Sequence, residues 1–498
     1  MSFHSKITAT SAVALMSASA AFADVTAQDV WDNWQQSLAI YGEGGVTIGS
    51  ENMVGSALQI TDLTMMMSDT DVDVTSTIPS IVFTENGDGT VSVTMSDSYT
   101  IEIADSPENV ATILVSQSGA NIVVSGDPGA MTYEMAADRI AVSLDEITDR
   151  GEDMPAEALL ALNGLSGSYT STMGDLNTVT YDVAVGGIDM LVDVTEPGGE
   201  GYFNFSGQIA GMGLVGAVSM PADMDLEAPE TIFIDGFAVD VGYEFGQSAY
   251  LFDFQDGSDA ANGTMSAGEG SFRLAVDYDN LVYETGLGGL AVAVAGSDIP
   301  LPVEFTLGEI GMGLDMPLSK TDAAVPLAAN FTLRDLAVSE MIWGMVDPGG
   351  MLSHEPATAV IQLTGLGRLF YDLMDPAQAM EAASAGIPGE LNSLSLDELI
   401  VSAAAAELLG SGAFTFDFGD FGTIPGVPRP EGSVTFNING LNGLLDTLVQ
   451  MGLAPEEEIM GARMMMGMFA NAVGDDMLES TFEVNAEGHV IANGQRIQ

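Results

Sequence analysis

Residues 91–103 read VSVTMSDSYTIEI, in which two runs of alternating apolar and polar residues follow each other. A period of two places successive side chains on opposite faces of a β-strand, whereas an amphipathic helix repeats every 3.6 residues. The same alternation recurs from about Val46 to Asp315, with turn-forming Gly, Pro, Asn and Asp between the runs. The sequence therefore predicts an antiparallel sheet with one solvated face and one buried face. The other clear runs are 72–74, 131–135, 179–185, 203–205, 272–276 and 303–307.

Helical periodicity is limited to shorter segments. A helix is predicted at 26–41, where the capping pair Thr26 and Asp29 precedes apolar residues at helical spacing, including Trp31 and Trp34. Within the strand-rich region only 155–163 is predicted to be helical, because Pro155 suits the first turn of a helix. Later helices are predicted at 339–346, 376–385, 441–451 and 455–471; strands are predicted at 413–418 and 434–438, and a hairpin at 480–484 and 489–492. The stretch 394–409 fits either a helix or a strand.

The predicted fold class is mainly β with some α. We expect a long, curved antiparallel β-sheet with a few packed helices and a helix-rich C-terminal third. The expected regions are a signal peptide at 1–23, a β-rich region with a leading helix at 24–315, and a β/α region at 316–498. One continuous elongated domain is the alternative, because the sequence has no linker or low-complexity segment.

Composition excludes several classes of function. The chain has 498 residues, with 72 Asp and Glu against 10 Lys and Arg, and a net charge of -62. Non-specific nucleic-acid binding is excluded because phosphates would meet carboxylates. Hydrophobic residues make up 47% and the mean hydropathy is +0.26, so the chain is not disordered through lack of hydrophobicity. The absence of Cys excludes disulfides, thiol nucleophiles and Cys-ligated metals.

The N-terminus predicts export. Lys6 precedes a short stretch of apolar and small residues, and Ala21-Phe22-Ala23 forms an A-x-A cleavage site. We therefore expect a signal peptide cleaved after Ala23 and a periplasmic protein. No later run of 18 apolar residues is present, so no transmembrane helix is expected.

No catalytic residue emerges from the sequence. A GxSxG motif is missing, and His354 and His489 fall in a loop and a terminal hairpin. Residues 211–216, GMGLVG, match the dinucleotide fingerprint, but the preceding strand alternates and no helix follows. We expect a non-enzymatic protein without an organic cofactor.

One loop is the better candidate for Ca²⁺, since Asp253, Asp256 and Asp259 offer hard oxygen ligands beside a flexible glycine. An ordinary acidic turn is the alternative interpretation. Asp69, Asp71 and Asp73 would share one face of a strand, which does not wrap three ligands around an ion.

Methionine is unusually abundant, with 30 residues. Met is flexible and is over-used where a surface adapts to varied apolar ligands, although a Met-filled core is the alternative. A C-terminal helix carrying such residues is predicted to cover a groove, with a cation near an anionic head group. The candidate ligand-binding residues are Arg463, Met464, Met465, Met468 and Phe469.

Several C-terminal segments resemble a known family. The segments are 441–452, LNGLLDTLVQMG, then 455–466 and 492–496, with WGMVDP at 343–348 and RLFYDLMDP at 368–376. They are similar to an uncharacterised exported alphaproteobacterial family, the domain of unknown function 2125. The strand pattern also looks distantly similar to AsmA-like envelope proteins, whose long sheets are associated with lipid handling. That similarity implies that 399–411 is a strand, and neither resemblance implies a catalytic residue.

The expected function is that of an exported periplasmic protein whose apolar sheet face holds a lipid or another apolar ligand in cell-envelope maintenance. Two alternatives remain open at this point, an outer-membrane β-barrel and a structural or calcium-dependent surface protein. The sequence leaves the ligand, the partners and the oligomeric state undetermined.

Overall fold

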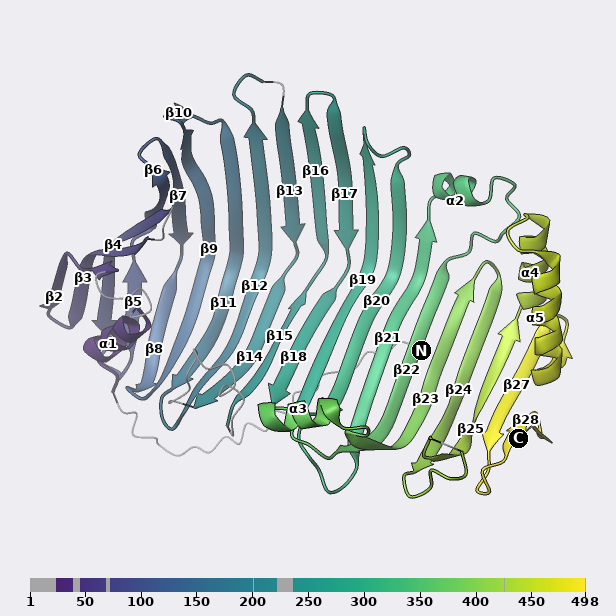
Figure 1. Ribbon diagram of the computed structural model, residues 1–498. Coiled ribbons are helices and arrows are strands. Elements are labelled where there is room, and N and C mark those ends of the chain that lie inside the picture. The colour runs from purple at the N-terminus through teal and green to yellow at the C-terminus, as the bar shows by residue number, and fades with distance from the viewer. Residues whose placement is uncertain are drawn as a thin grey trace.

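The computed structural model describes residues 24–38, 45–68, 72–199, 201–221, 236–424 and 426–497. Strands account for about 65% of the chain and helices for 11%. All strands join one antiparallel sheet, which forms a single curved layer (Figure 1). The predicted antiparallel sheet is confirmed, while the signal peptide predicted at 1–23 lies outside the described residues.

The strands follow one another along the chain, from the left of Figure 1 to the right. The first are β1 (Val46–Thr47), β2 (Ser50–Val54), β3 (Ala57–Ser68), β4 (Asp73–Glu85), β5 (Val91–Met95), β6 (Ser98–Ser106), β7 (Asn109–Ser118), β8 (Asn121–Asp127), β9 (Ala130–Asp149), β10 (Glu152–Asp153), β11 (Ala156–Thr172), β12 (Leu176–Thr195), β13 (Tyr202–Ile209) and β14 (Met212–Pro221). The others are β15 (Ala238–Phe245), β16 (Ser248–Asp256), β17 (Asp259–Ala267), β18 (Gly270–Asp277), β19 (Asn280–Gly296), β20 (Val303–Pro317), β21 (Val325–Val338), β22 (Ala357–Leu369), β23 (Gly389–Ala403), β24 (Ala406–Asp417), β25 (Arg429–Asn439), β26 (Asn471–Gly474), β27 (Met477–Val484), β28 (Val490–Ala492) and β29 (Gln495–Arg496).

Several long strands pair along one edge with two shorter strands, each of which covers about half of that edge. β12 pairs with β13 over its C-terminal half and with β14 over its N-terminal half, and β19 pairs in the same way with β17 and β18. β4 and β9 each pair with two shorter strands as well. From β19 to β25 the strands form a simple meander. Every long strand between β4 and β25 therefore has a hydrogen-bonded neighbour on both sides.

A seam of residues with positive φ crosses the sheet where the paired short strands meet. It includes Gly164 (φ +65°), Gly211 (+84°), Gly289 (+60°) and Asp335 (+56°). Neighbouring seam residues are joined by backbone hydrogen bonds, such as the Gly268 N–H to the Gly288 carbonyl oxygen at 2.7 Å. A residue with positive φ shifts the alternation of side chains between the two faces by one position. If odd-numbered residues point to one face before it, even-numbered residues point to that face after it. On β19 the apolar series runs Leu281, Tyr283 and Leu287 before the seam, and Leu290, Val292 and Val294 after it.

The well-packed core lies at the N-terminal end of the sheet, under α1 (Ala27–Leu38). Trp31 and Phe83 are fully buried, with ring centroids 5.8 Å apart. The indole Nε1 of Trp31 donates to Glu51 Oε2 at 3.1 Å, and the hydroxyl of Tyr133 donates to Asn33 Oδ1 at 2.8 Å. The rest of this hydrophobic cluster comes from α1 and the residue Val25 before it, and from β3–β5, β8 and β9.

The predicted capping pair of α1 is confirmed. The Asp29 carboxylate accepts the Thr26 N–H at 3.0 Å, and the Thr26 hydroxyl oxygen accepts the Asp29 N–H at 3.2 Å. These reciprocal bonds satisfy donors that the first turn of a helix leaves free.

Four further helices lie along the margins of the sheet (Figure 1). They are α2 (Glu340–Val346), α3 (Pro376–Ser384), α4 (Leu441–Gln450) and α5 (Glu456–Phe469), and they confirm the helices predicted in those segments. Asp375 caps α3 by accepting the N–H groups of Ala377 and Gln378.

The predicted fold class is wrong in its helix-rich C-terminal third. Strands β21 to β29 dominate that region, and its helices are short. The ambiguous stretch 394–409 belongs to two strands, β23 and β24, which turn at Ala404 and Ala405 with positive φ.

The helix predicted at 155–163 is also wrong, because Ala156 begins the long strand β11. Leu160 and Leu162 pair there with Met190 and Ile188 of β12. Cross-strand pairing of apolar side chains outweighs the weak local helix signal of Pro155.

The expected boundary near Asp315 falls within a strand. Asp315 lies in β20 and pairs with Val282 on one side and Ala328 on the other. The division of residues 24–498 into two regions stays a prediction.

Candidate functional site

One face of the sheet is lined by apolar side chains over most of its width; we call it the trough. Residues directly opposite each other in antiparallel strands point to the same face. One row can therefore be followed above the seam, from β6 to β21, without meeting a charged residue. It consists of Tyr99, Val115, Val142, Leu160, Met190, Gly207, Tyr250, Met265, Val292, Phe305 and Val338.

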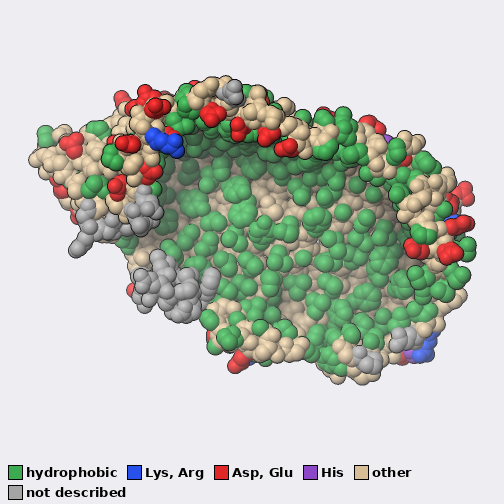
Figure 2. Space-filling view, turned by 45° about the horizontal axis from the view of Figure 1, so that its top comes forward, with side chains coloured by type: hydrophobic (Ala, Val, Ile, Leu, Met, Phe, Trp, Pro, Cys, Tyr) green, Lys and Arg blue, Asp and Glu red, His purple; other side chains and the backbone are tan. Residues whose placement is uncertain are grey.

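A second uncharged row crosses the sheet below the seam, from β8 to β25. Because the seam shifts the alternation, this row also belongs to the trough, and Figure 2 shows hydrophobic side chains over the whole hollowed face. The row consists of Ile122, Met135, Gly167, Val183, Leu214, Tyr243, Phe272, Thr285, Met312, Phe331, Ile361, Leu399, Gly410 and Phe436.

Large side chains of the trough remain open to solvent. The exposed fraction is 48% for Met312, 41% for Met265, 39% for Phe331 and 38% for Tyr243. A water-soluble protein rarely leaves contiguous apolar surface of more than a few hundred Å² uncovered unless something binds there. Among the described residues, only α1 packs broadly on this face, at its N-terminal end.

The trough is large on the scale of a lipid. β9 and β12 have 20 residues each, which corresponds to roughly 65 Å at about 3.3 Å per residue. The strands from β9 to β25 span roughly 60 Å at about 4.8 Å per strand. The hydrocarbon core of a bilayer, with two opposed layers of acyl chains, is only about 30 Å thick.

Aromatic rings of the trough lie over glycines of the neighbouring strand and fill the space that a side chain would occupy there. A Cβ atom on Gly207 would lie 2.7 Å from the ring of Tyr250, and one on Gly216 would lie 2.5 Å from the ring of Tyr181. Gly216 ends the dinucleotide-like motif and Gly211, which begins it, lies in the seam. The glycines of that motif therefore serve the sheet, in agreement with its rejection as a nucleotide site.

Ionisable groups are excluded from the lining, apart from tyrosines. Burial raises the pKa of Tyr133, Tyr169 and Tyr99, so these hydroxyls stay neutral at physiological pH. Tyr133 and Tyr169 stack with ring centroids 4.4 Å apart.

The opposite face, which we call the outer face, carries the charges. Arg273 pairs there with Asp240 at 3.1 Å and Glu284 at 3.9 Å. Arg334 pairs with Glu309 at 3.4 Å and Glu398 at 3.6 Å. The sheet is thus amphipathic, with polar and ionic contacts on one side and hydrocarbon on the other.

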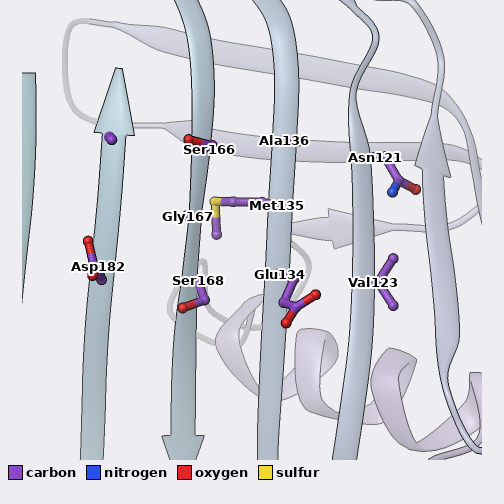
Figure 3. A pocket seen from close by; sticks show the side chains of 10 residues that line it. Asn121, Val123, Glu134, Met135, Ala136, Ser166, Gly167, Ser168 and Asp182 are labelled. Carbon is purple, nitrogen blue, oxygen red and sulfur yellow. The ribbon is translucent and has the colours of Figure 1, made fainter. Parts of the chain in front are cut away.

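Two shallow hollows, both open to solvent, lie on the described part of the outer face. Figure 3 shows the first, of about 510 Å³, with α1 behind the sheet and the side chains of Glu134, Ser168 and Asp182 around it. The second, of about 970 Å³, lies over Ala249, Ser266 and neighbouring small residues. Neither is enclosed, and neither gathers a recognisable set of catalytic groups.

The predicted calcium ligands lie at a hairpin tip. Asp256 and Asp259 face each other across the β16–β17 turn, whereas Asp253 is three residues earlier and points to the opposite face. Asp253 accepts a hydrogen bond from the Tyr202 hydroxyl at 3.3 Å. Within the described residues, no three His, Cys, Asp or Glu side chains converge as a metal site. Of the other acidic series, Asp69 and Asp71 lie outside the described residues.

The predicted ligand-binding residues lie on α5, at the C-terminal edge of the sheet. Met464, Met465 and Met468 are exposed, while the Phe469 ring packs 6.2 Å from that of Phe482. The Arg463 guanidinium is occupied, since it donates to Asp446 Oδ1 at 2.7 Å and to the Asn442 carbonyl at 2.9 Å. Arg463 therefore joins α5 to α4, and the role of the methionines in ligand binding stays a prediction.

The two histidines of the described chain lie apart from the trough rows. His354 stacks on Trp343 with ring centroids 4.4 Å apart, and its Nδ1 lies 3.0 Å from Glu340 Oε1. His489 lies between β27 and β28.

The sequence predicted an apolar sheet face that holds a ligand but did not name the residues that line it, although their signal is present. Apolar residues occupy odd positions in 179–185 and even positions in 188–194, and Gly186-Gly187 separates the two series. A change of parity at glycines, repeated in successive strands, marks the seam.

None of the described helices is long and apolar enough to cross a membrane.

Comparison with known proteins identifies a family. The family model described as "Uncharacterized protein conserved in bacteria (DUF2125)" matches residues 192–487, which is more than half of the chain. The chain belongs to this family, as its resemblance indicated. No curated protein and no solved structure matches the chain, so the similarity to AsmA-like proteins is not confirmed.

Proposed function

We propose that this member of the DUF2125 family is an exported periplasmic protein that binds lipids on the trough. The observation that carries the proposal is the uncharged and largely uncovered apolar face, which extends from β9 to β25. Export is supported by the signal-peptide pattern at residues 1–23.

Hydrocarbon is the chemistry that suits this surface. Removing an apolar methylene from water contributes roughly 0.8 kcal/mol. An acyl chain that covers Met265, Tyr250 and Phe305 would bury its own methylenes and these side chains together. Because the rows are long and lack charged residues, several chains can lie side by side.

A polypeptide suits the trough less well than an acyl chain does. A peptide laid across the face would bring backbone N–H and C=O groups that need hydrogen-bond partners. The strand backbones under the trough are already paired on both sides, and the lining side chains are almost all apolar. Acyl chains have no such requirement.

The test compares two double variants that add the same charge to the same strands. Met265→Glu with Phe331→Glu places two carboxylates in the trough. The matched control, Ser266→Glu with Asn330→Glu, places them one residue along each strand, at exposed positions on the outer face. Each protein is prepared from periplasmic extract without detergent and analysed by native mass spectrometry and lipid extraction.

We expect lipid on the wild-type protein and on the outer-face control, and at least a tenfold loss on the trough variant. A chain that begins at Asp24 in the periplasmic fraction is the expected result for export. Equal lipid on the two double variants, or none on the wild type, contradicts lipid binding on the trough. A co-purified polypeptide in place of lipid would favour a peptide-binding protein.

A further inference from the structure

We infer that the lipids bound on the trough carry an ammonium group and no net negative charge. This inference rests on the proposed function, and it goes further by naming the head group. It depends on where the cations of this chain lie and on which charges border the trough.

The cations are few, and most of them are paired with carboxylates. Of the 10 Lys and Arg, Lys6 belongs to the predicted signal peptide. Seven of the other nine are arginines with a carboxylate within 4.0 Å, so each is neutralised by the protein itself. They are Arg139, Arg150, Arg273, Arg334, Arg368, Arg429 and Arg463.

The paired arginines are also directed away from the trough rows. Arg273 and Arg334 occupy outer-face positions of β18 and β21. Arg429 is surrounded by Asp417, Asp420 and Glu431, at 3.1, 3.3 and 3.7 Å. No described arginine lies within the apolar rows, where it would meet the phosphate of a bound lipid.

Carboxylates dominate the upper border of the trough, where successive hairpins turn. Figure 2 shows acidic side chains along this rim. The one cation in these turns, Arg150, lies 4.0 Å from Asp149. The exposed acidic residues of the turns are Asp149, Glu152, Asp153, Glu196, Asp256, Asp259 and Asp298.

Head-group charge follows from this arrangement. The lining offers no cation and only a few polar groups, so a charged head group is expected to emerge at a border of the trough. At the upper border a lone phosphodiester would be repelled by carboxylates, whereas an ammonium group would be attracted. The Debye length is about 8 Å at physiological ionic strength, so the preference should weaken with salt. The Arg463 guanidinium, predicted as the cation for an anionic head group, donates to Asp446 and to the Asn442 carbonyl oxygen, and its role in ligand binding stays a prediction.

The experiment uses mixed vesicles, because a protein of net charge -62 avoids an anionic surface whatever its site prefers. Vesicles contain dioleoyl phosphatidylcholine and dioleoyl phosphatidylglycerol in equal amounts, so both lipids are presented by the same surface. The protein is separated from the vesicles, and the two lipids it carries are counted by mass spectrometry.

We expect phosphatidylcholine to exceed phosphatidylglycerol about fivefold at low salt and about twofold or less at 0.5 M NaCl, since screening shortens the reach of the rim charges. Reversing one rim charge, with Asp256→Lys or with Asp298→Lys, should lower the ratio. Glu244→Lys, on the outer face of β15, makes a similar charge change and should leave the ratio unchanged.

Two outcomes separate the inference from the proposal beneath it. Equal loading, or an excess of phosphatidylglycerol, overturns the head-group inference while lipid binding stands. A protein that carries neither lipid overturns the proposed function, and the inference with it.

Discussion

Trp31 is a single side chain on which the buried core at the N-terminal end of the sheet depends. It is fully buried, packs against Phe83 and donates its indole N–H to Glu51. Truncating such a residue removes buried area and leaves a cavity. Elsewhere, side chains of similar size, such as Phe331, are open on the trough.

We expect Trp31→Ala to lower the free energy of unfolding by about 3–5 kcal/mol. Trp34→Ala should cost less, because Trp34 is only partly buried against the same cluster. Chemical denaturation followed by circular dichroism measures both. A loss below about 1 kcal/mol for Trp31→Ala would show that this cluster does not anchor α1.

At the scale of elements, the seam decides which face each strand presents. Strand alternation alone would place the apolar residues of β11 and β19 on opposite faces above and below the middle of the sheet. Residues with positive φ, such as Gly164 and Gly289, correct this by shifting the parity. The cost of positive φ is small for glycine and larger for any residue with a Cβ atom.

Gly289 tests this role directly. Gly289→Ala should destabilise the protein by about 1–2 kcal/mol, since its φ of +60° disfavours a Cβ atom. Gly286→Ala, three residues earlier on β19, is the control because Gly286 has ordinary strand φ. Urea denaturation gives both values, and equal stability of the two variants would contradict the need for glycine in the seam.

The elements were largely predictable from local patterns. Alternation identified the strands from Val46 onward, and the capping pair Thr26 and Asp29 placed the start of α1. The stretch 155–163 was not predictable, because its strand state depends on pairing with β9 and β12, which lie outside any local window. The weight of helices in the last third was overestimated for the same reason.

At the scale of the whole molecule, the sequence predicted two unlike faces but expected the apolar one to be buried. Alternation reports polarity and carries no information on whether a second layer covers a face. The candidate residues on α5 and at the β16–β17 turn were chosen for their local chemistry, whereas the trough arises from residues contributed by many strands. Only the register across the sheet brings Tyr99 and Val338 into one row.

The charge of the molecule complements this architecture. Carboxylates on the outer face and at the turns keep a half-open apolar sheet hydrated, and their mutual repulsion opposes contact between the troughs of two copies. The net charge of -62 and the apolar trough are therefore compatible in one chain.

The most direct test of the central claim places a reporter on each face. Phe331→Trp puts an indole in the trough, and Asn330→Trp puts one on the outer face of the same strand. Each protein is loaded with phosphatidylcholine brominated along its acyl chains, and the tryptophan emission is compared with that of the parent, which contains Trp31, Trp34 and Trp343. We expect strong quenching of the indole at position 331 and little at position 330, because bromine quenches only at contact distance. Equal quenching at both positions, or quenching at position 330 alone, would contradict binding of acyl chains on the trough.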